Sequence, residues 1–350
     1  MKRIIYFILL LLPLVSGCTK TGSSPTVEKY DRYIFFSQVL ETKATLVDAL
    51  NNQTFGIVGF KYPNTSDTDW ASFISQNPAP TPNVFFNDNG LVNVEECRVN
   101  GTSASYAPLQ GWSKLKKYAF FAYYPLDKQN VTLVNLNGTP YSGGIPAIKY
   151  TMSTTAPSSS MWDVMTAVPH INLAGNSSQV TNSDVTFSFQ HCLSCLGLEI
   201  QNNSVGNITL KNVKFSLSGI QYSEVIIPLD GSGETCGGSN IPDNTTCSLT
   251  LTDADKTIVS GAQEHQLSDK LIFIPQDEDL TVQVEISYVR EASNGYPARE
   301  ATYESASLTT QLNKGNKHLI RLNFTDSNVD VVGKIYEEGW VKIEVEDSFN

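Results

Sequence analysis

The residues of this chain best suited to chemistry are its cysteines, and the first of them predicts attachment of lipid. Lys2 and Arg3 precede an apolar run of about eleven residues that ends in Val15-Ser16-Gly17-Cys18. This is the pattern of a bacterial lipoprotein signal, in which cleavage between Gly17 and Cys18 leaves a thiol for acylation, whereas a plain secretory signal closes with A-x-A-like residues. Several acyl chains anchor a protein durably, since each buried methylene contributes about 0.8 kcal/mol. The apolar run is shorter than the roughly 20 residues of a transmembrane helix.

Five further cysteines follow, and their odd number prevents complete pairing within the chain. Cys236 and Cys247 flank a loop rich in turn formers, so we expect a disulfide between them in an oxidising compartment. Cys192 and Cys195 have the C-x-x-C spacing of redox and zinc sites, but they lie in an apolar segment that is predicted to be one strand. Strand residues three apart point to opposite faces. We therefore expect both thiols to pack in the core and not to bind metal.

No catalytic or metal-binding motif is evident in the rest of the sequence. It contains neither G-x-S-x-G nor H-E-x-x-H, and its four histidines lack the spacing of metal ligands. His191 ends an apolar strand and is expected to be a hydrogen-bonded core residue, not a base. The glycines between 231 and 238 fit neither a dinucleotide fingerprint nor a Walker motif. We therefore expect no enzyme activity, no cofactor and no metal.

The composition argues against nucleic acid as a partner and favours a β protein outside the cytosol. The formal net charge of −11 falls to about −13 when the two basic residues of the signal are removed, and such an acidic chain repels a phosphate backbone. Charged residues form only 17% of the chain and aromatic residues 10%, with many Ser, Thr, Asn and Gly. This balance is typical of extracellular β proteins.

Short segments of alternating polar and apolar residues, separated by turn formers, predict an all-β fold. The clearest one runs from Leu280 to Tyr288, where every second residue is apolar. Such a period of two is typical of half-buried strands. Many strands without amphipathic helices favour β-sandwiches over a βαβ fold. Only two short segments look helical, at residues 68–76 and 159–168.

The length of the chain predicts two domains, each large enough to bury its own core. We expect a signal peptide at residues 1–17, a lipidated tether at 18–32, an N-terminal β-sandwich domain at 33–180 and a C-terminal β-sandwich domain at 181–350. The boundary rests on a run of turn formers at 173–184. A Ser/Thr-rich segment at 151–160 is the competing linker, which we interpret as a loop within the first domain.

A set of motifs spans nearly the whole mature chain in a recognisable order. The motifs are Ile34-Phe35-Phe36, Glu41-Thr42-Lys43-Ala44, Phe55-Gly56-Ile57-Val58-Gly59-Phe60, Asn83-Val84-Phe85-Phe86, Tyr106 to Trp112, Tyr118 to Pro125, Asp163 to Ala167, Val185 to Ser194, Gly315 to Leu322 and the late Trp340. With them the chain resembles the fimbrillin-like proteins, the lipoprotein pilins and accessory subunits of type V pili on anaerobic Gram-negative bacteria. No single motif is specific, so the resemblance depends on their order.

The resemblance implies two tandem transthyretin-like β-sandwich domains, a lipid anchor in the cell outer membrane, and assembly into a surface fimbrium by strand exchange with other pilus subunits. In that scheme a trypsin-like protease cuts after a basic residue and removes a strand. The candidate sites are Arg32 and Lys43, of which only Lys43 would release Tyr33 to Val39. The donor strand is expected at Trp340 to Glu346, where Val341, Ile343 and Val345 share one face.

These features favour a pilus subunit for adhesion, in a stalk, anchor or tip position, with host or bacterial surface ligands as further partners. The alternative is a surface glycan-binding lipoprotein of a carbohydrate uptake system, with Trp70, Trp112 and Trp162 as sugar platforms. A secreted hydrolase is a third hypothesis, which the lack of a catalytic motif disfavours. Stacking on a sugar needs exposed rings, so exposure of the tryptophans distinguishes the first two hypotheses.

Overall fold

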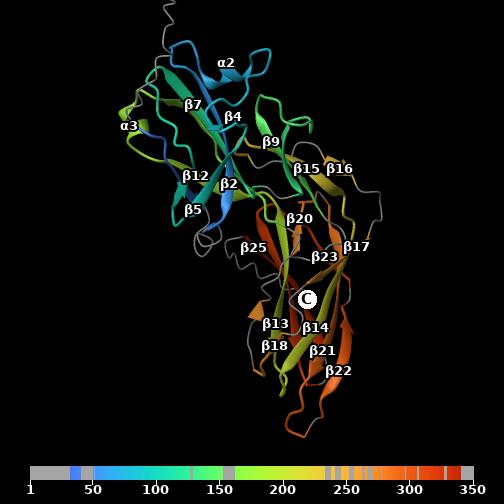
Figure 1. Ribbon diagram of the computed structural model, residues 1–350. Coiled ribbons are helices and arrows are strands. Elements are labelled where there is room, and N and C mark those ends of the chain that lie inside the picture. The colour runs from blue at the N-terminus through green and yellow to red at the C-terminus, as the bar shows by residue number, and fades with distance from the viewer. Residues whose placement is uncertain are drawn as a thin grey trace, which may run out of the picture.

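The described part of the chain folds almost entirely into β-strands, as expected for an all-β protein (Figure 1). The computed structural model describes residues 32–40, 50, 52–126, 129–152, 162–232, 238–240, 246–251, 256–261, 265–266, 271–276, 278–295, 297–305, 307–326 and 329–339. The earlier strands lie in the upper part of Figure 1 and the later ones in the lower part.

The amino-terminal half contains an eight-stranded sheet whose pairings close on themselves. In spatial order its strands are β10 (Met165–Ala167), β12 (Val185–His191), β1 (Phe36–Leu40), β6 (Ser103–Ser105), β5 (Glu95–Asn100), β2 (Thr54–Pro63), β7 (Lys116–Tyr124) and β11 (His170–Ala174). Because β10 also pairs with β7, every strand except β11 belongs to one closed ring. This half is therefore a single sheet curved around its own core.

Two neighbouring strands of this sheet, β2 and β7, are buried on both faces, since their odd and even residues enter different cores. One set points into the ring: Phe55, Ile57, Phe120 and Ala122. The intervening set belongs to a second core outside the ring: Val58, Phe60, Phe121 and Tyr123. Helix α2 (Trp70–Ile74) covers the second set with Trp70 and Phe73, and its first turn is closed by a capping box between Asp69 and Ser72. The helical prediction at 68–76 is thus confirmed.

The carboxyl-terminal half is a sandwich of two sheets whose facing sides form one apolar core (Figure 1). One sheet contains β13 (Ser194–Asn202), β19 (His265–Gln266), β20 (Leu271–Phe273), β24 (Asn316–Phe324) and β25 (Val329–Gly339). The other contains β14 (Ile208–Ser218), β17 (Thr246–Leu251), β18 (Thr257–Ile258), β21 (Leu280–Arg290), β22 (Arg299–Glu304) and β23 (Leu308–Thr310). Buried and half-buried residues alternate along β21, which confirms the prediction from Leu280 to Tyr288.

A four-stranded sheet joins the two halves. It contains β8 (Val131–Asn135), β9 (Pro146–Thr151), β15 (Tyr222–Pro228) and β16 (Gly238–Asn240), and β9 pairs with β15 over five residue pairs. The remaining elements are the hairpin of β3 (Phe86–Asn87) and β4 (Gly90–Leu91) and the short helix α3 (Ser178–Thr181). Backbone pairing therefore runs across the boundary that was expected at residue 180.

The position of strand β12 also differs from what a boundary at residue 180 predicts. It follows residue 180, yet it pairs with β1 and β10 of the first sheet and contributes Phe187 and Phe189 to the core of the ring. The turn formers at 173–184 connect β11 to β12 within the first sheet and contain α3. The chain instead passes from the first sheet to the second at Cys192 and Leu193, between β12 and β13. The segment predicted as one strand is therefore two, and residues 165–167 of the second helical prediction form strand β10.

Candidate functional site

Strand β1 is the element on which the expected strand exchange depends, and it lies between β12 and β6. It runs parallel to β12 over five residue pairs, from Phe36 opposite Val185 to Leu40 opposite Phe189. On its other side it is antiparallel to β6. We call β1, the two strands beside it and the core residues under it the β1 site. Loss of β1 would leave two unpaired edges facing each other.

Backbone hydrogen bonds hold the residues around β1 on both sides. The amide of Ile34 donates to the carbonyl oxygen of Gln110 at 2.8 Å, and that of Gln38 donates to Thr102 at 2.9 Å. On the opposite side the amide of Val185 donates to the carbonyl oxygen of Phe35 at 2.9 Å. Residues 33–40, which we call the β1 segment, are thus an integral part of the sheet, and release of this segment requires cooperative breaking of these bonds.

The inward face of the segment presents three buried side chains, Ile34, Phe36 and Gln38, which we call the first, second and third inward positions. Phe36 is the centre of an aromatic cluster. Its ring centroid lies 5.2 Å from Phe120, 5.3 Å from Tyr106, 5.7 Å from Phe187 and 6.2 Å from Phe85. Burial of one such ring contributes about 1.5 to 3 kcal/mol, so the second inward position supplies much of the packing of β1.

Two details of the neighbouring chain shape this aromatic cluster. Gly59 in β2 leaves room for Phe85, because a Cβ atom added at Gly59 would lie 2.6 Å from the Phe85 ring. Tyr106 holds the segment directly, since its hydroxyl donates to the carbonyl oxygen of Ile34 at 2.9 Å and accepts from the amide of Gln110 at 3.1 Å. Its contact with β1 is therefore both aromatic and polar.

The third inward position is polar and only partly satisfied. Gln38 is 1% exposed, and its Nε2 donates to the carbonyl oxygen of Gly101 at 3.1 Å. Its Oε1 is buried and has no hydrogen-bond partner among the described residues. Gly101 lies in the turn between β5 and β6, where its φ of 63° favours glycine. An unsatisfied buried amide oxygen costs about 1 to 3 kcal/mol.

A carboxylate lies inside the ring close to Tyr106. Glu95 begins β5, is buried, and accepts a hydrogen bond from the backbone amide of Ala107. Burial raises the pKa of Glu95 from 4.5 to about 7, with a smaller contribution from the charge of Glu96. Burial likewise raises the pKa of the Cys97 thiol well above its usual value, so this cysteine is an inert core residue.

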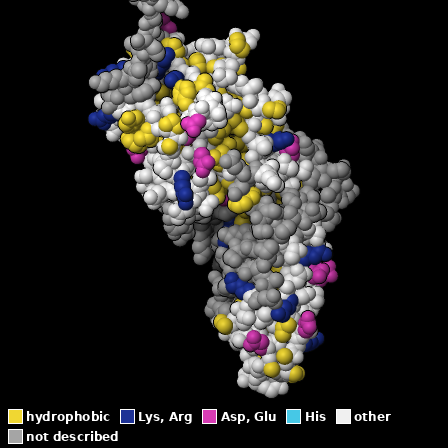
Figure 2. Space-filling view, viewed as in Figure 1, with side chains coloured by type: hydrophobic (Ala, Val, Ile, Leu, Met, Phe, Trp, Pro, Cys, Tyr) yellow, Lys and Arg dark blue, Asp and Glu magenta, His cyan; other side chains and the backbone are white. Residues whose placement is uncertain are grey.

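The outer face of the segment is unusually apolar for a surface. Tyr33 is 53% exposed and Phe35 49% exposed, and with Arg32 and residues 181–184 they line an open hollow of about 330 Å³. Hydrophobic side chains are also frequent over the upper, amino-terminal half of the face shown in Figure 2. The β1 segment thus carries aromatic residues toward both the core and the solvent.

The predicted maturation and donor residues fall mostly outside the described residues. This holds for Gly17, Cys18, Lys43, Cys236, Trp340, Val341, Ile343 and Val345. Arg32 is described: it is exposed, directly precedes the β1 segment, and its carbonyl oxygen accepts from the amide of Trp112 at 2.9 Å. Cys247 lies in β17 opposite Leu217 of β14. Strand β25 pairs with β24 and ends at Gly339, one residue before the predicted donor segment.

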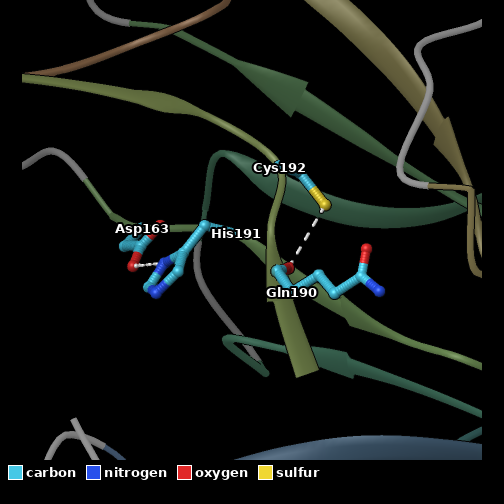
Figure 3. Close-up of polar contacts among 4 residues, drawn as sticks. All are labelled: Asp163, Gln190, His191 and Cys192. Atoms are coloured by element: carbon cyan, nitrogen blue, oxygen red, sulfur yellow. Dashed lines mark hydrogen bonds and ion pairs between the residues drawn. The ribbon is translucent and has the colours of Figure 1, made fainter. Parts of the chain in front are cut away.

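His191 and Cys192 are neighbours in sequence but point to different surroundings (Figure 3). Nδ1 of His191 lies 2.6 Å from Oδ2 of Asp163, as expected for a hydrogen-bonded core histidine. The Cys192 side chain points away from this pair, and its Sγ lies 3.3 Å from Oγ1 of Thr166 and 3.7 Å from the carbonyl oxygen of Gln190. Burial raises the pKa of Cys192 to about 11. These three residues therefore do not form a Cys-His-Asp nucleophile site.

The remaining chemical expectations can be compared with the described residues. Cys192 and Cys195 are both fully buried, which confirms that they pack in the core. Within the described ranges, no group of three or more His, Cys, Asp or Glu side chains could hold a metal ion. A search of the same ranges finds no helix with the length and hydropathy needed to cross a membrane.

The tryptophans separate the two leading hypotheses. Trp112 is 3% exposed and lies in the core of the ring, and Trp70 is 8% exposed and packs on Phe60 and Phe121. Only Trp162 of the three proposed sugar platforms is half-buried. Buried rings cannot stack on a glycan, so the platforms predicted at Trp70 and Trp112 are wrong.

Comparison with known proteins agrees with the all-β fold. A fimbrial protein from Bacteroides vulgatus ATCC 8482 superposes with a TM-score of 0.62 at 20% sequence identity, covering 89% of this chain and 100% of that chain. A protein of Bacteroides ovatus ATCC 8483 with a suspected role in cell adhesion gives a TM-score of 0.49 at 18% identity, covering 91% of this chain and 100% of that chain. No curated protein matches the chain. The profile of the fimbrillin-like family matches residues 42–340, and the chain therefore belongs to that family.

Proposed function

We propose that this protein is a cell-surface subunit of a fimbrium, that it assembles by strand exchange and that it serves in adhesion. Membership of the fimbrillin-like family supports the coarser statement, that of a fimbrial protein. The observation that carries the finer one is the position of β1, a five-residue strand near the amino end that completes a closed sheet over an aromatic core. A sheet that lacks such a strand offers backbone edges and an apolar groove to another strand.

The cut that would open the β1 site is assigned to Lys43. Arg32 precedes the segment, so cleavage there leaves β1 in place. Lys43 follows β1 and precedes β2, so cleavage there separates β1 covalently from the rest of the sheet. Release of the freed segment then depends on the hydrogen bonds and ring contacts of the β1 site.

The incoming strand is assigned to residues 340–346 of a neighbouring subunit. This segment directly follows β25, and its alternating Val341, Ile343 and Val345 resemble a strand with one apolar face. Contact of this kind joins the end of one subunit to the beginning of the next, so it builds an open chain of subunits and not a closed ring.

The anchor and the domains complete the proposal. Cleavage after Gly17 and acylation of Cys18 would attach the protein to the outer membrane. Replacement of Cys18 by Ala should then leave an unprocessed precursor, and normal acylation and surface display of this variant would contradict the assignment. The two halves, the ring and the sandwich, are proposed to be two domains of the transthyretin-like type that divide at Cys192 and Leu193.

The central experiment is limited digestion with trypsin followed by electrophoresis without boiling. Cleavage at Lys43 should convert monomers into ladders of polymers. Lys43→Gln should prevent the ladders, whereas Arg32→Gln, the matched control, should not. Deletion of the last ten residues should abolish polymers and leave the monomer folded. Ladders that persist after the deletion place the donor elsewhere, and a cleaved chain that never polymerises favours an anchor, a tip or a glycan-binding role.

A further inference from the structure

We propose that Gln38 weakens the hold of the resident strand in the β1 site, and that the incoming strand replaces it by an apolar side chain at the same inward position. The inference rests on the proposed strand exchange and deepens it. Its chemical basis is the difference between an amide and an apolar side chain at one buried position.

Gln38 is the only polar residue among the three inward positions. Ile34 and Phe36 are completely enclosed by apolar groups, whereas Gln38 makes one hydrogen bond, to Gly101, and leaves Oε1 buried without a partner among the described residues. A buried polar atom without a partner favours the unbound strand, because water satisfies that atom after release. Ile34 and Phe36 thus stabilise the bound state of β1, whereas the side chain of Gln38 destabilises it.

The carboxyl-terminal segment carries apolar residues at the same spacing. If it enters in the direction of β1, parallel to β12, it can form the same hydrogen bonds with β12 and β6. Val341 and Ile343 then occupy the first and second inward positions, and Val345 occupies the third. This register replaces the unsatisfied amide by an isopropyl group. The carbonyl oxygen of Gly101 can turn to water, because Gly101 is exposed.

The carbonyl oxygen that accepts from Gln38, that of Gly101, stays behind when β1 leaves and provides a test of this register. A shift by two residues would place Ile343 at the third position, and entry in the opposite direction would place Val341 there. The third position has a carbonyl acceptor for a glutamine side chain, namely Gly101. A glutamine scanned through the donor should therefore be tolerated at just one place, and that place identifies the residue over Gly101.

The first test uses the intact chain and does not depend on exchange. Gln38→Met keeps the length of the side chain and removes the amide, so the midpoint of thermal unfolding should rise by a few degrees relative to the wild type. Gln38→Leu provides a second apolar variant in case methionine packs poorly. Ser37→Ala, on the outer face of the same strand, is the matched control and should change the midpoint less. An unchanged or lowered midpoint in both Gln38 variants overturns the weakening role.

The second test uses protein cut at Lys43 and a synthetic peptide of residues 338–348, with release of β1 followed by mass spectrometry. The Val345→Gln peptide should bind within about tenfold of the wild-type peptide, whereas Val341→Gln and Ile343→Gln should each weaken binding by more than about fiftyfold. The register is overturned if the glutamine peptide that binds best carries the substitution at Val341 or Ile343, or if all three substitutions weaken binding equally. Failure of every peptide to bind cleaved protein that has lost β1 overturns strand exchange and the register together, while the thermal comparison still decides whether Gln38 weakens β1.

Discussion

The two halves of the molecule are both all-β, but they bury different side chains in different ways. The ring of the amino-terminal half encloses a core rich in aromatic residues, among them Phe36, Phe55, Phe120 and Phe187. The sandwich of the carboxyl-terminal half is filled mainly by Leu, Ile and Val from β13, β14, β21 and β24. Large rigid rings leave a large void when one strand departs, whereas small branched side chains can close over a smaller one. Loss of a single strand should therefore destabilise the amino-terminal half more than the carboxyl-terminal half.

The largest expected effect comes from the centre of the aromatic cluster. Phe36→Ala should lower the free energy of unfolding by about 3 to 5 kcal/mol, because it removes a buried ring with four aromatic neighbours. Leu217→Ala in β14 is the matched change in the sandwich and should cost about 2 to 4 kcal/mol. Denaturant unfolding followed by aromatic fluorescence measures both. A smaller loss for Phe36→Ala than for Leu217→Ala would contradict the comparison.

The next effect is a pH dependence of the free energy of unfolding, which we expect from Glu95 inside the ring. The folded-state pKa of Glu95 is raised from 4.5 to about 7, so the neutral form is favoured in the fold. The stabilisation is fully present below about pH 4.5 and is lost as the pH rises to about 7. One pKa unit corresponds to about 1.4 kcal/mol, and we reduce the expected loss to about 1 to 2 kcal/mol for solvent screening.

Glu95→Gln keeps a neutral side chain at every pH and provides the test. Between pH 4.5 and pH 7.5 the free energy of unfolding of the wild type should fall, whereas that of the variant should not fall with it. Above this range the difference between the two free energies should be constant. Parallel pH profiles throughout would show that the carboxylate is ionised in the fold at the usual pH.

A smaller effect is expected at the polar contact that holds the β1 segment. Tyr106→Phe removes the hydrogen bond from the hydroxyl to the carbonyl oxygen of Ile34 and should cost about 1 kcal/mol. Hydrogen exchange should speed up in β1 more than in β2. Tyr288→Phe is the control in the sandwich, since its hydroxyl makes no hydrogen bond to the described residues, and it should change stability by less than about 0.5 kcal/mol. Equally faster hydrogen exchange in all strands of the sheet would show that this hydrogen bond does not act locally on β1.

The smallest effect is expected where the halves meet at the surface. Nζ of Lys149 on β9 lies 3.3 Å from Oε2 of Glu224 on β15, and both side chains are about one third exposed. Lys149→Ala should therefore change the free energy of unfolding by less than about 0.5 kcal/mol. A loss above 1 kcal/mol would mean that this ion pair, and not the backbone pairing, joins the halves.

The sequence predicts those parts of the fold that depend on neighbouring residues. The strand from Leu280 to Tyr288 is an example, since each of its faces is evident from alternation alone. The break at Cys192 and Leu193 could not be found in this way, because no Gly or Pro marks it. It is determined by distant partners, with β12 pairing to β1 and β13 pairing to β24.

The candidate site likewise has a part that local sequence predicts and a part that depends on distant residues. A strand was expected at residues 33–39, and the structure has β1 at Phe36–Leu40, because strand propensity is a local property. The role of Gln38 depends on Gly101, which lies in a turn between two other strands, and the role of Tyr106 depends on the carbonyl oxygen of Ile34. Such contacts arise only when the ring closes. Glutamine within an otherwise apolar face was the one available signal.

The sheet shared by β9 and β15 has a mechanical consequence for a protein proposed to work in a fibre. The covalent passage between the halves at Cys192 and Leu193 is a single chain, which alone would act as a hinge under tension. Five backbone pairs between β9 and β15 form a second connection beside it. Bending or pulling the halves apart must break these hydrogen bonds as well as stretch the chain. The shared sheet thus makes the subunit a stiff link, able to transmit a load from one end to the other.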